Sequence, residues 1–180
     1  MRPESFFFGN YTLSAEQILG ADKRFGLDGA LLLYHDALRF NLEHEGAIDN
    51  GWGALVTGRY YFIPTQQPGS GLYTGPYVSF KNLNMSDTWY DYSGSQSSTQ
   101  TWQTTQQRGV IGWAGGMKAV IDGKFVIELD GGIGRALLST STVATGNRPA
   151  GFEEASSFEG NLDLYARLGV GWRFGMQAAR

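Results

Sequence analysis

The sequence predicts an all-β fold in which eight strands form one antiparallel up-and-down barrel. The first observation is the segment NLDLYARLGVGWRF at 161–174, where every even position is apolar and the odd positions include Asp163, Arg167 and Arg173. Such alternation indicates a strand with two different faces. The second observation is the composition, because 26 glycines and an aromatic share of 14% suit closely packed strands. The third is that short and long connections alternate along the chain.

Segments with this strand character follow one another in a single domain that covers residues 1–180. Gly9-Asn10 is expected to form a tight turn between the first two segments, and whether 1–9 makes a full strand is left open. A short helix is an alternative only in 40–48, and 175–180 is expected to be a short tail. The predicted strands are 4–9, 10–19, 24–35, 51–63, 71–83, 108–121, 124–138 and 161–174.

The connections between these segments fall into two classes. Asp122-Gly123 is a strong signal for a tight hairpin turn. The long connections are polar, and the middle one is rich in Ser, Thr and Gln. Short turns at one end and long loops at the other are typical of barrels in an outer membrane. The short connections are 20–23, 64–70 and 122–123, and the long ones are 36–50, 84–107 and 139–160.

The two faces of the predicted strands differ in size as well as in polarity. Phe125 and Ile127, for example, alternate with Glu128. An eight-stranded barrel has room inside only for side chains, so the face that mixes small residues with a few charged ones fits the interior. The bulky apolar face then meets lipid, which predicts a transmembrane barrel with a polar, plugged lumen. The alternative, with the bulky face inside, is a soluble lipocalin-like barrel that binds a small apolar ligand.

Acidic and basic residues nearly balance on the predicted inner face. Buried charges are tolerated when they are paired and hydrogen-bonded, which suits a closed lumen rather than an open pore. Arg24 and Arg173 are expected near the mouth of the barrel. The predicted lumen charge network is Glu16, Asp28, Arg59, Lys81, Lys118, Glu128, Asp130, Asp163 and Arg167.

Aromatic residues form two further groups of candidate sites. One group lies on the outer face near the short turns, where a membrane–water interface is expected. The other lies in the long polar connection, where it is expected either to contact a partner or to pack over the barrel mouth. The interface aromatics are Phe25, Tyr60, Phe62, Phe125, Trp172 and Phe174, and the possible partner-contact residues are Trp89, Tyr90, Tyr92 and Trp102.

Four segments resemble a family of small eight-stranded outer-membrane β-barrels of Bacteroidota that is known as a domain of unknown function. The paired motif is GWGALVTGRYYF at 51–62 and GLYTGPYVSF at 71–80. FFFGNYTLSAEQIL at 6–19, with Glu16 in an acidic position, and LGVGWRFG at 168–175 are also similar to the family. The chain departs from it by a shorter first strand and by a tail after Phe174. The resemblance implies a fold and a place in the cell envelope, but no reaction.

The sequence offers little support for catalysis. His35 and His44 lack a serine at the spacing used by outer-membrane lipid deacylases, although Ser86 or Ser139 could approach in space. A lipid-modifying hydrolase is therefore kept as an alternative, and no cofactor or metal is expected. The chain has no cysteine.

We therefore expect an integral outer-membrane protein with a structural or interaction role, as a scaffold or as an accessory subunit of an envelope complex. Its expected partners are outer-membrane lipid or lipopolysaccharide, and a larger protein complex. A net charge of −3 gives no argument for nucleic-acid binding. Because no secretory signal opens the sequence, the signal peptide of an exported form is expected to have been removed.

Overall fold

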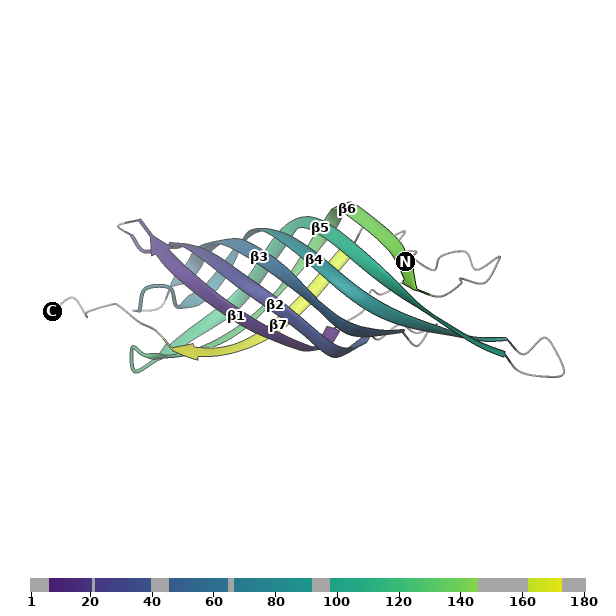
Figure 1. Ribbon diagram of the computed structural model, residues 1–180. Coiled ribbons are helices and arrows are strands. Elements are labelled where there is room, and N and C mark those ends of the chain that lie inside the picture. Colours follow the sequence, from purple (N-terminus) through teal and green to yellow (C-terminus); the bar gives the residue numbers. More distant parts are fainter. Residues whose placement is uncertain are drawn as a thin grey trace.

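The computed structural model describes the backbone of residues 7–20, 22–39, 46–64, 67–91, 98–145 and 162–172, and the side chains of 11–20, 22–35, 48–64, 67–86, 101–143 and 162–172. Its strands form one antiparallel meander in which each strand pairs with the next along the chain. The sheet curls into an open half-barrel (Figure 1). The strands are β1 (Phe7–Leu19), β2 (Phe25–Arg39), β3 (Gly46–Pro64), β4 (Gly71–Asp91), β5 (Ser98–Ile121), β6 (Phe125–Thr145) and β7 (Leu162–Trp172).

The described part of the chain has a seven-stranded sheet instead of the predicted eight strands, because the turn predicted at Gly9-Asn10 is wrong. β1 continues through these residues and stays paired with β2 on both sides of them, since Phe8 lies opposite Leu38 and Asn10 opposite Tyr34. The irregularity is a register shift between Phe8 and Asn10. A bulge of this kind bends a strand without reversing it.

The long connections predicted from the sequence are largely wrong as well. β4 and β5 extend through most of 84–107, and Trp89 and Tyr90 lie opposite Gln100 and Thr99 in their ladder. β6 likewise continues to Thr145. Thr, Tyr and Trp favour strands, and a hairpin with polar side chains on both faces gives no apolar alternation to recognise. The helix considered for 40–48 falls mostly outside the described residues. The described part of this segment, 46–48, belongs to β3.

The tight turn predicted at Asp122-Gly123 is confirmed. Asp122 and Gly123 have φ angles of 51° and 69°, and Lys124 N–H donates to the Ile121 carbonyl at 3.1 Å. Two successive positive φ angles match the twist of the flanking strands. We call the end of the sheet that holds this turn and the β1–β2 connection the turn end, and the opposite end, where β4 meets β5, the far end.

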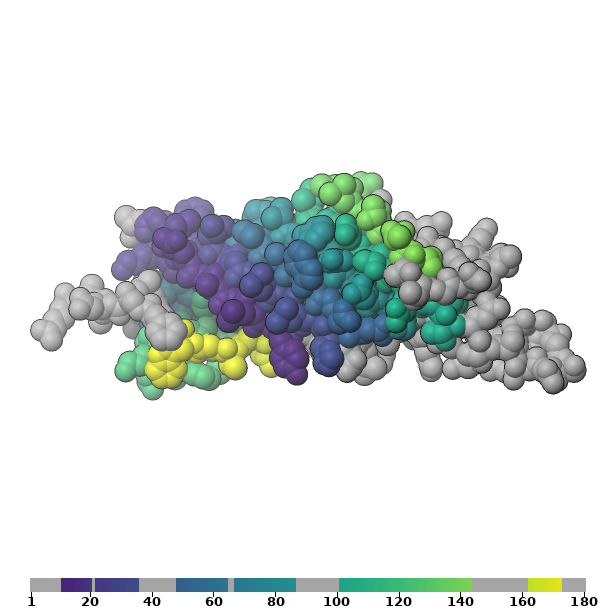
Figure 2. Space-filling model, viewed as in Figure 1, coloured from purple at the N-terminus to yellow at the C-terminus, as the bar shows by residue number. Residues whose placement is uncertain are grey.

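The sheet buries the face with charged and small residues and exposes the bulky apolar face. Leu13, Val78 and Leu129 are 75%, 52% and 55% exposed, whereas Arg59 is only 2% exposed. In Figure 2 the outer side chains of β1 to β4 form a continuous wall. The inner face is not uniformly polar: as β2 leaves the turn end, its inward residues pass from Asp28 to an apolar group. That group, which packs with other strands, is Ala30, Leu32 and Tyr34.

Glycines on β5 and β6 make room for tyrosine rings inside the curled sheet. The rings of Tyr77 and Tyr165 meet edge to face, with centroids 5.2 Å apart and planes at 89°. A methyl group at Gly112 would lie 2.5 Å from both Gly134 Cα and Tyr77 Cε1. Real carbon atoms do not approach this closely, so the interior around Gly112 is as narrow as its side chains allow.

We expect Gly112→Ala to lower the free energy of unfolding by about 1–3 kcal/mol, because the added methyl group overpacks the interior. Gly29→Ala is the matched control, since nothing lies within 4 Å of a methyl group added there. Denaturant unfolding followed by tryptophan fluorescence measures both variants. Equal stability of the two would contradict the narrow interior.

Candidate functional site: the charge network of the inner face

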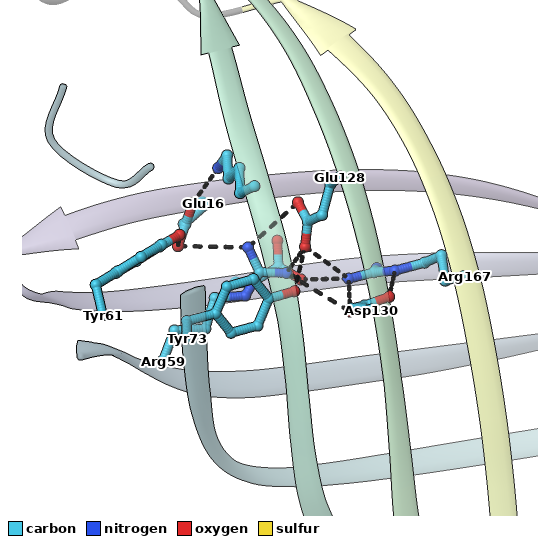
Figure 3. A network of polar contacts seen from close by, with 9 residues as sticks. Glu16, Arg59, Tyr61, Tyr73, Glu128, Asp130 and Arg167 are labelled. Atoms are coloured by element: carbon cyan, nitrogen blue, oxygen red, sulfur yellow. Dashed lines mark hydrogen bonds and ion pairs between the residues drawn. The ribbon is translucent and has the colours of Figure 1, made fainter. Parts of the chain in front are cut away.

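Arg59 on β3 is the centre of a network of charged side chains inside the curled sheet (Figure 3). Its Nη2 lies 2.5 Å from Glu128 Oε1 and 3.0 Å from Asp28 Oδ2, and its Nη1 lies 3.4 Å from Glu16 Oε1. The guanidinium also stands over the Tyr73 ring, with Cζ 4.5 Å from the ring centroid. A planar cation with this many donors can hold several carboxylates at once.

Arg167 on β7 joins the same carboxylates from the edge of the sheet. Its Nε and Nη2 donate to the two oxygens of Asp130 at 3.0 and 2.8 Å, in the bidentate arrangement that carboxylates favour. Nη2 also donates to Asp28 Oδ2 at 3.1 Å. Asp28 is therefore shared by Arg167 and Arg59, which links β2, β3 and β7 through a single carboxylate.

Glu16 on β1 is held by groups from two other strands. Its carboxylate forms an ion pair with Lys118 on β5, and Tyr61 OH on β3 donates to Oε1 at 2.7 Å. On β4, Tyr73 OH donates to Glu128 Oε1 at 2.5 Å. Each strand of the described sheet thus contributes at least one side chain to the network.

A second, smaller group of charges lies nearer the far end. Lys81 Nζ on β4 contacts both oxygens of Asp163 on β7, at 2.8 and 3.0 Å. Arg108 Nη2 on β5 donates to the Leu162 carbonyl at 2.7 Å. The two groups together bring all nine residues of the predicted lumen network into ion pairs. Of the two predicted mouth residues, Arg24 is exposed and Arg173 lies outside the described residues.

The sequence interpretation missed Arg108 and the tyrosine hydroxyl groups. The sequence predicts Arg108 at the start of a strand after a long loop, whereas it lies within β5 and shares the inner face of this strand with Gln106 and Val110. Tyrosines count as apolar in an alternation pattern. Tyr61 and Tyr73 were therefore not recognised as hydrogen-bond donors to the buried carboxylates.

The charges of the two groups complement one another. In the larger group the carboxylates of Glu16, Asp28, Glu128 and Asp130 outnumber the cations of Arg59, Lys118 and Arg167 by one. In the smaller group Lys81 and Arg108 outnumber Asp163 by one. The two described groups together are thus formally neutral, which is a condition for keeping so many charges out of water.

The network joins the strands of the sheet through ion pairs and hydrogen bonds, and none of the described residues considered for catalysis is part of it. Ser86 Oγ donates to Asp49 on the neighbouring strand, and Ser139 lies opposite Arg108 on β5. His35 is exposed on β2 opposite Asn50, and His44 lies outside the described residues. Among the side chains that the structure describes, no three His, Asp or Glu residues are grouped to hold a metal ion.

Five of the predicted interface aromatics lie within the described residues, on the outer face at the turn end. Phe25 begins β2 and its ring contacts that of Tyr60, with centroids 5.2 Å apart. Trp172 ends β7 opposite Phe125, and Phe62 is also exposed. Phe174 falls outside the described residues.

The predicted partner-contact loop needs correction. Trp102 is not on a loop: it belongs to β5 and is only 3% exposed, so its ring is buried rather than available to a partner. Trp89 and Tyr90 belong to β4, and their side chains, like Tyr92, lie outside the described residues. The error has the same cause as the missed strand extensions, namely the polar composition of 84–107.

The fold and this network define a curled antiparallel meander sheet with a charged interior. No protein-family model, curated protein or solved structure matches the chain. The resemblance to the Bacteroidota outer-membrane barrels therefore stays a prediction. No helix in the described part of the chain is long and apolar enough to cross a membrane.

We expect Arg59→Met to lower the free energy of unfolding by about 3–5 kcal/mol, because it leaves buried carboxylates without their central cation. Arg135→Met is the matched control: Arg135 is exposed on β6, and its loss should change stability by less than about 0.5 kcal/mol. Denaturant unfolding measures both. Similar losses for the two arginines would mean that the network contributes little to the fold.

Proposed function

We propose that this chain is an integral β-barrel protein of a bacterial outer membrane, with a structural or interaction role as a scaffold or accessory subunit. The observation that carries the proposal is the outer face. Its strands present large apolar side chains to the surroundings, and many of them, such as Leu31, Ile111 and Leu129, are about half exposed. An apolar surface this extensive needs a partner or a membrane to cover it.

The length of the apolar band supports a membrane as the covering medium. A strand crosses the hydrocarbon core in about 9–11 residues when it is tilted. Outer apolar residues occupy comparable stretches of four neighbouring strands. Each stretch is followed toward the far end by a polar outer residue, namely His35, Asn50, Asn82 or Gln107. The stretches are 25–33 on β2, 52–62 on β3, 72–80 on β4 and 111–121 on β5.

Aromatic residues border the band at both ends. Those at the turn end include Phe25 and Trp172. Toward the far end, the exposed rings of Trp52 and Phe80 contact one another, with centroids 5.6 Å apart, just before Asn50 and Asn82 are reached. Two aromatic girdles around an apolar band are the usual outer surface of a barrel in an outer membrane.

The interior supports a structural role rather than transport. Arg59 and its carboxylates cross the inside of the sheet, where an open channel would need free space. The same distribution of residues argues against the lipocalin-like alternative, because such a barrel needs its bulky face inside to hold an apolar ligand. No observation on the described residues favours the hydrolase alternative.

Extraction and gel mobility test the membrane assignment directly. We expect the protein to leave the membrane fraction only with detergent, and to migrate differently on a denaturing gel before and after boiling, because a curled sheet held together by its ladders and its internal ion pairs resists the detergent until heated. A chain that disperses in water as a monomer and shows no shift would overturn the proposal.

A pair of arginine substitutions tests where the membrane lies. Val78→Arg places a charge in the middle of the band on β4 and should cost about 2–4 kcal/mol of insertion free energy. Gln107→Arg places it at the polar border on β5 and should cost at most about 1 kcal/mol. Insertion into lipid vesicles, followed by the boiling-dependent mobility shift, measures both. Equal insertion of the two variants would contradict the assigned band.

A further inference from the structure

Within the described residues the half-barrel has two unpaired edges, and both run in the same direction. The described strand order begins with β1 and ends with β7, and no ladder joins these two strands. Direction alternates in a meander, so the first and seventh strands are parallel to one another, and their arrowheads lie at the same end in Figure 1. An antiparallel ladder between β1 and β7 is therefore impossible, although every other pair in the sheet is antiparallel.

A cavity of about 1110 Å³ opens between these two edges and reaches the charged interior. Its lining includes 12–16 of β1 and 166–172 of β7, with residues of both faces, and also inner-face residues of other strands such as Asp28, Leu55 and Lys81. Leu13 and Leu168 are each 75% exposed, whereas outer leucines with a strand on either side, such as Leu27 and Leu31, are 49% and 56% exposed. The sides of β1 and β7 that face away from the sheet are thus uncovered. We call the cavity between these two strands the edge slot.

A membrane makes an uncovered slot costly, because backbone N–H and C=O groups find no water there and each unsatisfied group costs several kcal/mol. An acyl chain could fill the slot but offers no hydrogen bonds. A second copy inserted in the same direction presents its own edges parallel to these. One extended strand, antiparallel to both edges, satisfies the two rows of backbone groups at once.

On the basis of the proposed function, we infer that the edge slot binds one extended strand of another polypeptide, antiparallel to β1 and β7. The charges that face the slot already have partners, since Glu16 pairs with Lys118 and Arg167 with Asp130. Inward residues of the bound strand are therefore small and uncharged. Its outward residues are apolar, because they continue the band between Leu13 and Val170.

Disulfide cross-linking tests both the site and the direction of binding. The chain has no cysteine, so a single introduced thiol is unambiguous. The probe is a synthetic peptide of about 11 residues, long enough to cross the band, in which Leu and Ser alternate and a single cysteine replaces the first, seventh or last residue. β1 runs toward the turn end and ends at Leu19. An antiparallel peptide therefore cross-links Leu19→Cys through an N-terminal cysteine and not through a C-terminal one, and it cross-links Leu13→Cys through the cysteine at its seventh residue.

Leu31→Cys is the matched control, because Leu31 lies opposite Leu13 in the β1–β2 ladder but has a strand on either side. We expect one peptide per chain at Leu13→Cys, loss of cross-linking at Leu31→Cys, and no cross-linking by a peptide in which the same residues are grouped in blocks. Equal cross-linking at both positions, the opposite direction, or no binding would overturn the inference. The boiling-dependent shift of the same variants is read separately, so a barrel that inserts but takes up no peptide refutes only the slot.

Discussion

The guanidinium groups of Arg59 and Arg167 impose the curvature on which the rest of the structure depends. In a flat sheet, β2 and β7 would lie five strand spacings apart, or roughly 24 Å. Arg167 Nη2 nevertheless lies 3.1 Å from Asp28 Oδ2. The ion pair exists only because the sheet curls, and the curled sheet keeps these charges stable only because the ion pairs form. A buried cation without its carboxylates is strongly destabilising, so curvature and charge pairing require one another.

The same curvature explains the unusual use of glycine and tyrosine on the inner face. Curling brings β5 and β6 close to the rings that project from β4, and a methyl group at Gly116 would lie 2.7 Å from Tyr73 OH. Tyr73 in turn donates to Glu128 and lies beneath Arg59. The glycines are therefore part of the polar network, because they provide the space in which a phenol can reach a buried carboxylate.

Alternation made the face assignment and the network predictable, because a period of two places Glu128 and Asp130 on one face whatever the partner strand is. The Asp122-Gly123 turn was predictable because its backbone demands are local. Other features depend on which strand pairs with which, and the sequence of a single segment does not contain this information. β1 passes through Gly9-Asn10 since both sides pair with β2, and the polar segment that includes Trp102 is a strand since a neighbouring strand satisfies its backbone.

In the described sheet the two edges are held relative to one another by side chains rather than by a backbone ladder. Glu16 anchors β1 through Lys118 and Tyr61, and Arg167 anchors β7 through Asp130 and Asp28. These contacts cross the interior, so they hold each edge against the opposite wall instead of against the other edge. The network can consequently maintain the curl while the edges stay apart, and its charges are paired without any group from a bound strand. An opening between β1 and β7 is thus compatible with an ion pair for every charged residue of the larger group.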